Sequence, residues 1–294
     1  MHVAVRAPDH LGDAVMALAA VDALRSLGTV VVHARARWAP ELYAPHPVVG
    51  EAPPRTADLA VMFKPSSHAA RQWRHLPTLG VGPAGRYSHT LPEAQEHRRD
   101  RYSRIVVAAG ARPPGAAQFV PRGVSPQLPE RFVALNPWSP SRTVRWPHFG
   151  ALASALSPIP VVAFCGPGEA EVVRARVGSG VALVAGLSLP DFASALEGCV
   201  AFVSNDSGAA HFAAACGVRV VMVHGSTAPE LTGVGAAVER ESRLWCQPCY
   251  RKFCGWGTPC LDVAVQPVLS VVMEEWGRGL CPRNAPGPSR PERG

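Results

Sequence analysis

The chain has 294 residues, a formal net charge of +7 and a pI of about 9.2. This length accommodates two compact domains. No apolar run is long enough to cross a bilayer, and the start MHVAVRAPDH lacks the pattern of a signal peptide, so a cytoplasmic location is expected. Eight cysteines do not argue against this, since a chain of this size can form a core without disulfides. The positive charge favours anionic partners, namely phosphates, nucleic acid or an acidic lipid surface.

The N-terminal part alternates short apolar segments with helical patterns. Alternation of this kind predicts a parallel sheet covered by helices on both faces. The predicted strands are 2–6, 29–34 and 57–63. One predicted helix begins near residue 13, and two others cover about 69–76 and 100–109.

Residues 112–129 hold five prolines and two glycines and show little periodicity, which is typical of a linker between domains. The alternation then resumes. The predicted strands are 132–136, 160–166, 181–186, 199–204 and 218–225, and the predicted helices lie near 147–156, 168–177, 189–197, 209–216 and 267–278. The sequence therefore predicts an α/β protein with domains 1–125 and 126–281 and a disordered, proline-rich tail, 282–294.

The first candidate site is RAPDHLGD, residues 6–13, which joins the first strand to the first helix. Ligands of such sheets bind at the carboxyl ends of the strands. Asp13 there suits a general base for an acceptor hydroxyl. An ordinary helix-capping aspartate is the simpler interpretation of its position alone.

The second candidate is FVSNDSGAAHFAAACGV, residues 202–218, where a buried strand turns into a helix of small residues. The first N–H groups of that helix, at Ser207, Gly208 and Ala209, would form an anion site. Asp206 or Ser207 is expected to cap the helix, which is compatible with phosphate binding. His211, one turn further on, would by itself be a structural residue.

Two further motifs follow strands. In NPWSPSRTVRWPHF, residues 136–149, Arg142 and Arg145 can make charge-assisted contacts to a diphosphate, although either alone is more simply a solvated charge. CGPGEAE, residues 165–171, lacks the third glycine of a dinucleotide fingerprint. Glu169 is better placed to hold ribose hydroxyls.

Four cysteines fall in a loop with the spacing C-x2-C-x4-C-x5-C, namely Cys246, Cys249, Cys254 and Cys260. This spacing can hold structural zinc or an iron–sulfur cluster. It fits the usual two-knuckle pattern only loosely, so packed thiols in a structured loop are the favoured interpretation. A zinc-bearing nucleic-acid binder would interleave aromatic residues with charges on an exposed face, whereas here the charges are scattered and the apolar segments are buried-strand runs, so this alternative is weak.

Taken in order, LGD, N-P-x-S…R-W-P, G-x-G-E and S-N-D-S-G-x-x-H resemble the motifs of glycosyltransferase family 9, the heptosyltransferases of lipopolysaccharide core synthesis. The cysteine loop is similar to a segment of the second heptosyltransferase type. The resemblance covers essentially the whole chain and is strongest between residues 131 and 275. It implies a GT-B fold of two Rossmann-like domains and an inverting, metal-independent transfer from an ADP-sugar to an acceptor hydroxyl.

The resemblance also assigns residues. The 1–125 domain would hold the acceptor, with Asp13 as catalytic base, and the 126–281 domain would hold the donor. Asp206 matches the aspartate that holds sugar hydroxyls. The other positions that match donor-binding residues are Ser139, Glu169, Leu187, Ser188, Ser207, Gly208 and His211. The implied partners are a nucleotide sugar and a glycan or glycolipid at the cytoplasmic face of the membrane, with no nucleic acid and no cofactor.

One departure from the family pattern concerns the diphosphate. Relatives usually carry a lysine two residues before the Trp of the W-P pair, and here that position is Val144. The phosphate role would therefore fall to Arg142 or Arg145. The acceptor stays open between a lipopolysaccharide core and a small secondary metabolite. An NAD-dependent oxidoreductase is the weaker alternative because the glycine pattern is incomplete.

Overall fold

The computed structural model describes residues 1–64, 66–120 and 123–279. Contacts divide the chain into two compact units, Met1–Gln118 and a second unit that begins at Phe119. The predicted disordered tail, 282–294, lies outside the described residues.

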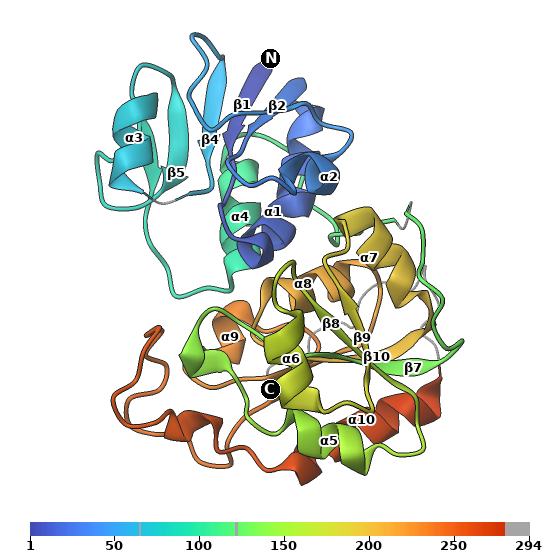
Figure 1. The fold of residues 1–294 in the computed structure, drawn as a ribbon. Helices are drawn as coiled ribbons and strands as arrows, with labels where there is room; N and C mark the ends of the chain where they lie inside the picture. Colours follow the sequence, from blue (N-terminus) through green and yellow to red (C-terminus); the bar gives the residue numbers. More distant parts are fainter. Residues whose placement is uncertain (65, 121–122, 280–294) are drawn as a thin grey trace. The chain divides into compact units, whose positions relative to one another are not determined.

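The first unit is a parallel six-stranded sheet in the order β3-β2-β1-β4-β5-β6 (Figure 1). All neighbouring strands run parallel, for example β1 with both β2 and β4. Its strands are β1 (His2–Arg6), β2 (Thr29–His33), β3 (Val48–Val49), β4 (Leu59–Met62), β5 (Thr78–Val81) and β6 (His89–Leu91), and its helices are α1 (Leu11–Ala23), η1 (Leu24–Ser26), α2 (Ala39–Tyr43), α3 (Ser67–Trp73) and α4 (Arg98–Ala108).

Helices can cover both faces of this sheet, because successive side chains of a strand point to opposite faces. Ala4, Ala60 and Met62 share one face and pack against α3 through the fully buried Trp73. Helix α4 packs against α1. Helix α1 is buried from Ala14 to Val21, and the alanines in this stretch allow close packing.

The second unit repeats the plan with the order β12-β11-β10-β7-β8-β9, again with all neighbours parallel (Figure 1). Its strands are β7 (Phe132–Asn136), β8 (Val161–Cys165), β9 (Ala182–Ala185), β10 (Cys199–Asn205), β11 (Val220–Val223) and β12 (Ala236–Val238). Its helices are η2 (Arg142–Val144), α5 (Phe149–Ala155), α6 (Ala170–Val177), α7 (Leu189–Ala195), η3 (Leu196–Gly198), α8 (Gly208–Ala215), α9 (Pro229–Thr232), η4 (Pro259–Leu261) and α10 (Val265–Arg278).

Both faces of this second sheet are apolar, as expected of a parallel sheet buried on both sides. Odd-numbered β7 residues, Val133 and Leu135, pack with the helices that contain Phe149 and Val268. Phe132 and Ala134 face the other way, toward Ala210 and Ala213 of α8. The strand order in each unit places a topological switch point beside its first strand, and such points are where ligands of doubly wound sheets bind.

The predicted α/β class and two Rossmann-like sheets are confirmed. The unit boundary lies before the 125/126 position expected from composition, because Phe119 already packs on the second unit. Its N–H donates to the carbonyl of Ala215 at 2.8 Å, and its ring lies 4.8 Å from that of Phe212. Short elements without a clear period were not predicted, namely β3, β5, β6, β12, α2 and α9. Across the described ranges, no helix has the length and apolar character needed to span a membrane.

Candidate active site

The switch point of the second unit is built from the carboxyl ends of β7 and β10. Asn136 ends β7, and its amide oxygen accepts from the hydroxyls of Ser204 at 3.4 Å and Ser207 at 3.2 Å. The two hydroxyl oxygens also lie 2.9 Å apart, so either hydroxyl can donate to the other in place of Asn136. The Asn136 amide nitrogen donates to the Phe164 carbonyl at 3.0 Å. This buried network fixes the turn that leads into α8.

Helix α8 begins at Gly208, directly above this network. Ser207 is its N-cap, and the Ser207 hydroxyl accepts from the Ala210 N–H at 3.4 Å. Other N–H groups of the first turn have no intrahelical acceptor, and the helix dipole adds positive potential there. Because Gly208 has no side chain and Ala209 a small one, an anion can approach the backbone closely. The predicted capping role of Ser207 is confirmed.

Asp206 is the charged group of this turn, with a side chain only 11% exposed. Thr232 donates to it at 2.9 Å, and the imidazoles of His211 and His224 lie 3.7 and 4.0 Å from its carboxylate oxygens. Burial alone would raise the pKa of Asp206, but the His211 contact and the nearby histidines outweigh burial and lower it to about 2. Asp206 is therefore a carboxylate at neutral pH.

His224 lies directly behind Asp206 and is completely buried. Burial lowers its pKa, although the Asp206 charge acts in the opposite direction. Its Nδ1 lies 3.2 Å from the Thr227 hydroxyl, whereas Nε2 has no hydrogen-bond partner in the described part of the chain. His211 lies in α8, His224 follows β11 and Thr232 ends α9, so the residues around Asp206 come from three separate segments.

The loop after β7 carries the predicted phosphate residues. The Arg145 guanidinium stacks 3.6 Å from the Trp138 ring and donates to the carbonyls of Ser139 and Pro140. Burial and the nearby charges of Arg176 and Arg142 lower the pKa of Arg145. Ser139 is buried, and its hydroxyl accepts from the Ser141 N–H at 3.3 Å. Arg145 and Ser139 thus hold the shape of this loop.

Arg142 differs from Arg145 in being exposed, and among the described residues its guanidinium makes no hydrogen bond or ion pair. Val144, at the position where relatives carry lysine, is 5% exposed. A valine suits that buried position, whereas a lysine would have to extend its ammonium to solvent. Of the two arginines, Arg142 is the one whose guanidinium is available to an incoming anion.

The predicted nucleoside contacts lie after β8 and β9. Glu169 precedes α6, and one of its carboxylate oxygens accepts from the Gly166 N–H at 2.8 Å, which closes the β8–α6 turn. The Ser188 hydroxyl caps α7 through the Asp191 N–H and donates to the Asp191 carboxylate at 2.7 Å. Leu187 packs against the core beside it. A ligand role for these residues stays a prediction.

The switch point of the first unit carries a charged cluster. Arg6 ends β1, is 2% exposed, and donates to Asp9 at 3.0 Å and to Glu51 at 2.9 Å. Lys64, which follows β4, also pairs with Asp9. Burial opposes ionisation of Asp9, but the bonds from Lys64 and Arg6 outweigh it and lower its pKa. These pairs tie together the loops after β1 and β4.

Asp13 lies one turn beyond this cluster, in the first turn of α1. It does not cap that helix, because the N-cap position is His10. The Asp13 carboxylate instead accepts from Arg98 at 2.5 Å, and its side chain is 17% exposed. Buried Tyr43 and Tyr102 lie nearby, and burial, with a smaller effect of the Asp13 charge, raises the pKa of each phenol. Both phenols stay protonated at neutral pH, and a catalytic role for Asp13 stays a prediction.

The cysteine loop is anchored to the second unit by its backbone. The Cys249 and Tyr250 N–H groups both donate to the Ser226 carbonyl at 3.0 Å. Thr143 donates to the Arg251 carbonyl. Burial raises the pKa of the Cys260 thiol, and the other three thiols of the loop act in the same direction. Within the described residues, no group of three or more His, Cys, Asp or Glu side chains is arranged to hold a metal ion.

We expect the cysteine loop to be structural. Cys246→Ser with Cys249→Ser should reduce the free energy of unfolding by about 1 kcal/mol, because hydroxyls replace partly buried thiols. Turnover per folded molecule should be unchanged. Urea unfolding and assays of the folded fraction check these expectations. Loss of turnover in folded protein would contradict the structural role, and stoichiometric zinc or iron in anaerobically purified protein would contradict packed thiols.

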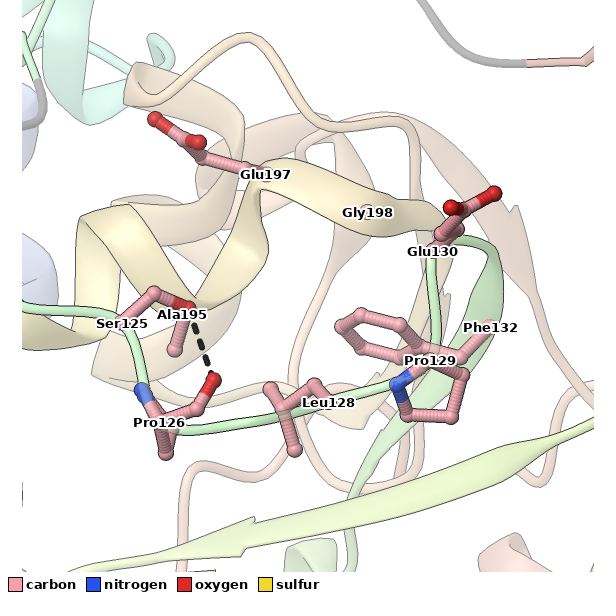
Figure 2. Close-up of a pocket in the computed structure, with 9 residues that line it drawn as sticks. All are labelled: Ser125, Pro126, Leu128, Pro129, Glu130, Phe132, Ala195, Glu197 and Gly198. Carbon is pink, nitrogen blue, oxygen red and sulfur yellow. Dashed lines mark hydrogen bonds between the residues drawn. The ribbon is translucent and has the colours of Figure 1, made fainter.

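A pocket of about 340 Å³ lies elsewhere in the second unit (Figure 2). Its lining includes Phe132, where β7 begins, and Gly198, just before β10, so it opens at the amino ends of those strands. The carboxylates of Glu130 and Glu197 point away from each other in Figure 2 and do not form a paired site. This pocket is therefore separate from the polar groups at the carboxyl edge.

The structure adds residues that the motifs did not indicate. Asn136 and Ser204 were within predicted motifs but had no assigned role. The others come from distant segments, namely Arg6, Asp9, Lys64, Arg98, His224 and Thr232. Most of these residues lie at or shortly after the end of a strand, or in the first turn of a helix, and this position is the signal that could have identified them. Thr232 differs, because it lies at the end of a short helix.

Comparison with known proteins identifies the family and the fold of this chain. The family model "Glycosyltransferase family 9 (heptosyltransferase)" matches residues 90–257, more than half of the chain. A search of curated proteins gave no match. Similar solved structures include E. coli ADP-heptose lipopolysaccharide heptosyltransferase II, with TM-score 0.69, 18% identity and coverage of 95% of this chain and 99% of that one. A family 9 glycosyltransferase from Veillonella parvula has a TM-score of 0.72 and 16% identity, with coverage of 95% of this chain and 97% of that one. E. coli heptosyltransferase WaaC with ADP has a TM-score of 0.66 and 17% identity, with coverage of 94% of this chain and 100% of that one.

Proposed function

The chain belongs to glycosyltransferase family 9, the heptosyltransferases, and on that premise we propose that it transfers a heptose or similar sugar from an ADP-sugar to an acceptor hydroxyl with inversion. The observation that carries the proposal is the turn at Asn205–Gly208. It combines an open helix N-terminus with a buried, ionised Asp206 at the switch point of a Rossmann-like sheet.

The donor has two parts that this turn can recognise separately. The diphosphate is an anion and suits the first-turn N–H groups of α8, with Arg142 as an additional cation. The sugar carries hydroxyls, and an ionised carboxylate such as Asp206 is a strong acceptor for them. The ADP complex of the similar WaaC supports a choice of ADP as the nucleotide.

The proposed reaction is a direct displacement. Asp13 removes the proton from the acceptor hydroxyl as its oxygen attacks the anomeric carbon from the face opposite the leaving group. The bond from that carbon to the diphosphate oxygen breaks, and the negative charge that develops on ADP is stabilised by α8 and Arg142. Arg98 holds the Asp13 carboxylate in position.

The proposed transfer needs no metal ion. The groups proposed to stabilise the developing negative charge are the first-turn N–H groups of α8 and the Arg142 guanidinium, in the role that a divalent cation has in other transferases. The proposed acceptor is a glycan or glycolipid of the lipopolysaccharide-core class.

The donor site should prefer ADP over UDP and GDP. Leu187, Ser188 and Glu169 follow the strands where a nucleoside would lie, and the family resemblance assigns them to adenine and ribose. Isothermal titration of the full chain with each nucleotide diphosphate should show ADP binding at least about tenfold tighter, a difference of about 1.4 kcal/mol. UDP binding tenfold tighter than ADP would show that the donor is another nucleotide sugar.

A further inference from the structure

The cysteine loop presents aromatic side chains to solvent. Trp245 is 85% exposed, Trp256 and Phe253 are each 66% exposed, and Tyr250 is 43% exposed. They lie within residues 245–256, in the loop between β12 and α10. The two tryptophan rings lie 5.5 Å apart, so Trp245 and Trp256 form one contiguous aromatic patch. Contiguous exposed apolar surface of this kind marks an interaction site.

The charge of the same loop is one-sided. Residues 242–261 contain Arg243, Arg251 and Lys252 and no acidic residue. Arg243 pairs with Glu230 and Glu239. Arg251 and Lys252 are exposed, lie between Tyr250 and Phe253, and form no ion pair within the described residues. The aromatic surface therefore has two cations available to a negatively charged partner.

Hydrogen bonds to residues of the second unit fix the backbone of the loop. Its backbone N–H groups and the Arg251 carbonyl bond to Ser226 and Thr143, and the Gln247 amide donates to the Gly225 carbonyl at 2.7 Å. Cys260 and Leu261 are buried. The aromatic side chains thus project from an ordered base, so that little conformational entropy is lost when they bind.

We propose that this aromatic-basic loop, residues 245–256, docks the protein onto an anionic phospholipid surface. Tryptophan and tyrosine rings partition to the boundary between headgroups and acyl chains. Arginine and lysine beside them are attracted to anionic headgroups. A second copy of the chain fits less well, because a two-fold contact would bring Arg251 and Lys252 of both copies together. The inference is independent of the transfer reaction.

Binding of the purified full chain to vesicles tests this proposal. It should sediment with vesicles of equimolar phosphatidylcholine and phosphatidylglycerol and much less with phosphatidylcholine alone. Each cation near an anionic surface contributes about fivefold in affinity, so Arg251→Glu with Lys252→Glu should weaken binding by about thirtyfold or more. Arg71→Glu with Arg74→Glu makes the same charge change on exposed residues of α3 and its C-cap, and should have a smaller effect.

The aromatic contribution is tested separately. Trp245→Ala with Trp256→Ala should weaken vesicle binding by at least about tenfold and leave the melting temperature nearly unchanged, because both rings are exposed in the free protein. Brominated lipids should quench wild-type tryptophan fluorescence and quench this variant less. Met273→Ala, in the exposed part of α10, is the control.

Three results would overturn the proposal. The first is failure of the wild type to sediment with anionic vesicles, and the second is loss of binding by the matched Arg71 and Arg74 variant as complete as that of the loop variant. The third is that the loop variants convert an oligomer to a monomer by light scattering while vesicle binding persists, which would assign the loop to a contact between copies.

Discussion

Asp13→Asn is expected to lower turnover by about 10²–10⁴-fold, the usual contribution of a positioned general base. A sugar hydroxyl is a poor nucleophile, and the nearby phenols of Tyr43 and Tyr102 stay protonated, so no neighbouring group replaces the carboxylate. ADP affinity should be nearly unchanged, because Asp13 belongs to the first unit. Steady-state kinetics and calorimetry on the same preparation measure both quantities.

The stability of this variant should change little. The Asp13–Arg98 pair is partly exposed, with Arg98 41% exposed, and pairs of this kind contribute about 0–1 kcal/mol. Asp22→Asn is the matched control, because Asp22 lies in the same helix and also accepts from a basic side chain, His46. It should keep wild-type turnover. Retention of more than about a tenth of the activity by Asp13→Asn would be inconsistent with a general base.

Arg98→Gln separates the two roles at this position. It removes the guanidinium that orients Asp13 and leaves the carboxylate in place. If Asp13 is the base, this variant should lose less turnover than Asp13→Asn, because the carboxylate that accepts the proton remains. Equal losses in both variants would indicate that the ion pair is needed as a unit.

The sequence predicted the two sheets because buried parallel strands are nearly continuous apolar runs. Segments such as 132–136 and 199–204 could be identified by composition alone. Strands β3, of two residues, and β12, of three residues, are too short to show a period, and they are strands only because they pair with a neighbouring strand. The domain boundary was predicted at 125/126, after its position in the structure, because the contact of Phe119 with α8 joins residues that are far apart in the sequence.

The candidate site was predictable where its residues are consecutive. Asp206, Ser207 and Gly208 occupy one turn, so strand-to-helix geometry sufficed to bring them together. His224 and Thr232 reach Asp206 only through the parallel packing of β10 beside β11, and no local pattern signals that contact. Arg98 likewise meets Asp13 because α4 packs on α1.

Asp206→Asn is expected to weaken binding of an ADP-sugar by about tenfold to a hundredfold, the range for loss of a hydrogen bond to a charged group. The shape of the side chain is kept, and the Thr232 hydroxyl can still donate to the remaining amide oxygen. Because the proposed partner of Asp206 is the sugar and not the diphosphate, binding of ADP alone should change much less. Calorimetry with both ligands distinguishes these outcomes.

A purely structural role makes a different prediction. If Asp206 only organises the turn, Asp206→Asn should weaken ADP and ADP-sugar binding equally, since both need the α8 N-terminus. Asp262→Asn, at an exposed aspartate of the same unit that follows η4, is the matched substitution and should leave both affinities unchanged.

The pH dependence of stability gives an independent test of the same carboxylate. The folded pKa of Asp206, about 2, lies below its ordinary value of 3.8, so its contribution to stability is fully present above the ordinary value. That contribution is lost as the pH falls through the folded value, and the shift corresponds to about 2 kcal/mol. The stability advantage of the wild type over Asp206→Asn should therefore shrink by about 2 kcal/mol between neutral pH and the folded pKa. Urea unfolding of both proteins across this range measures the change, and a difference independent of pH would show that the ionised form has no special stabilisation.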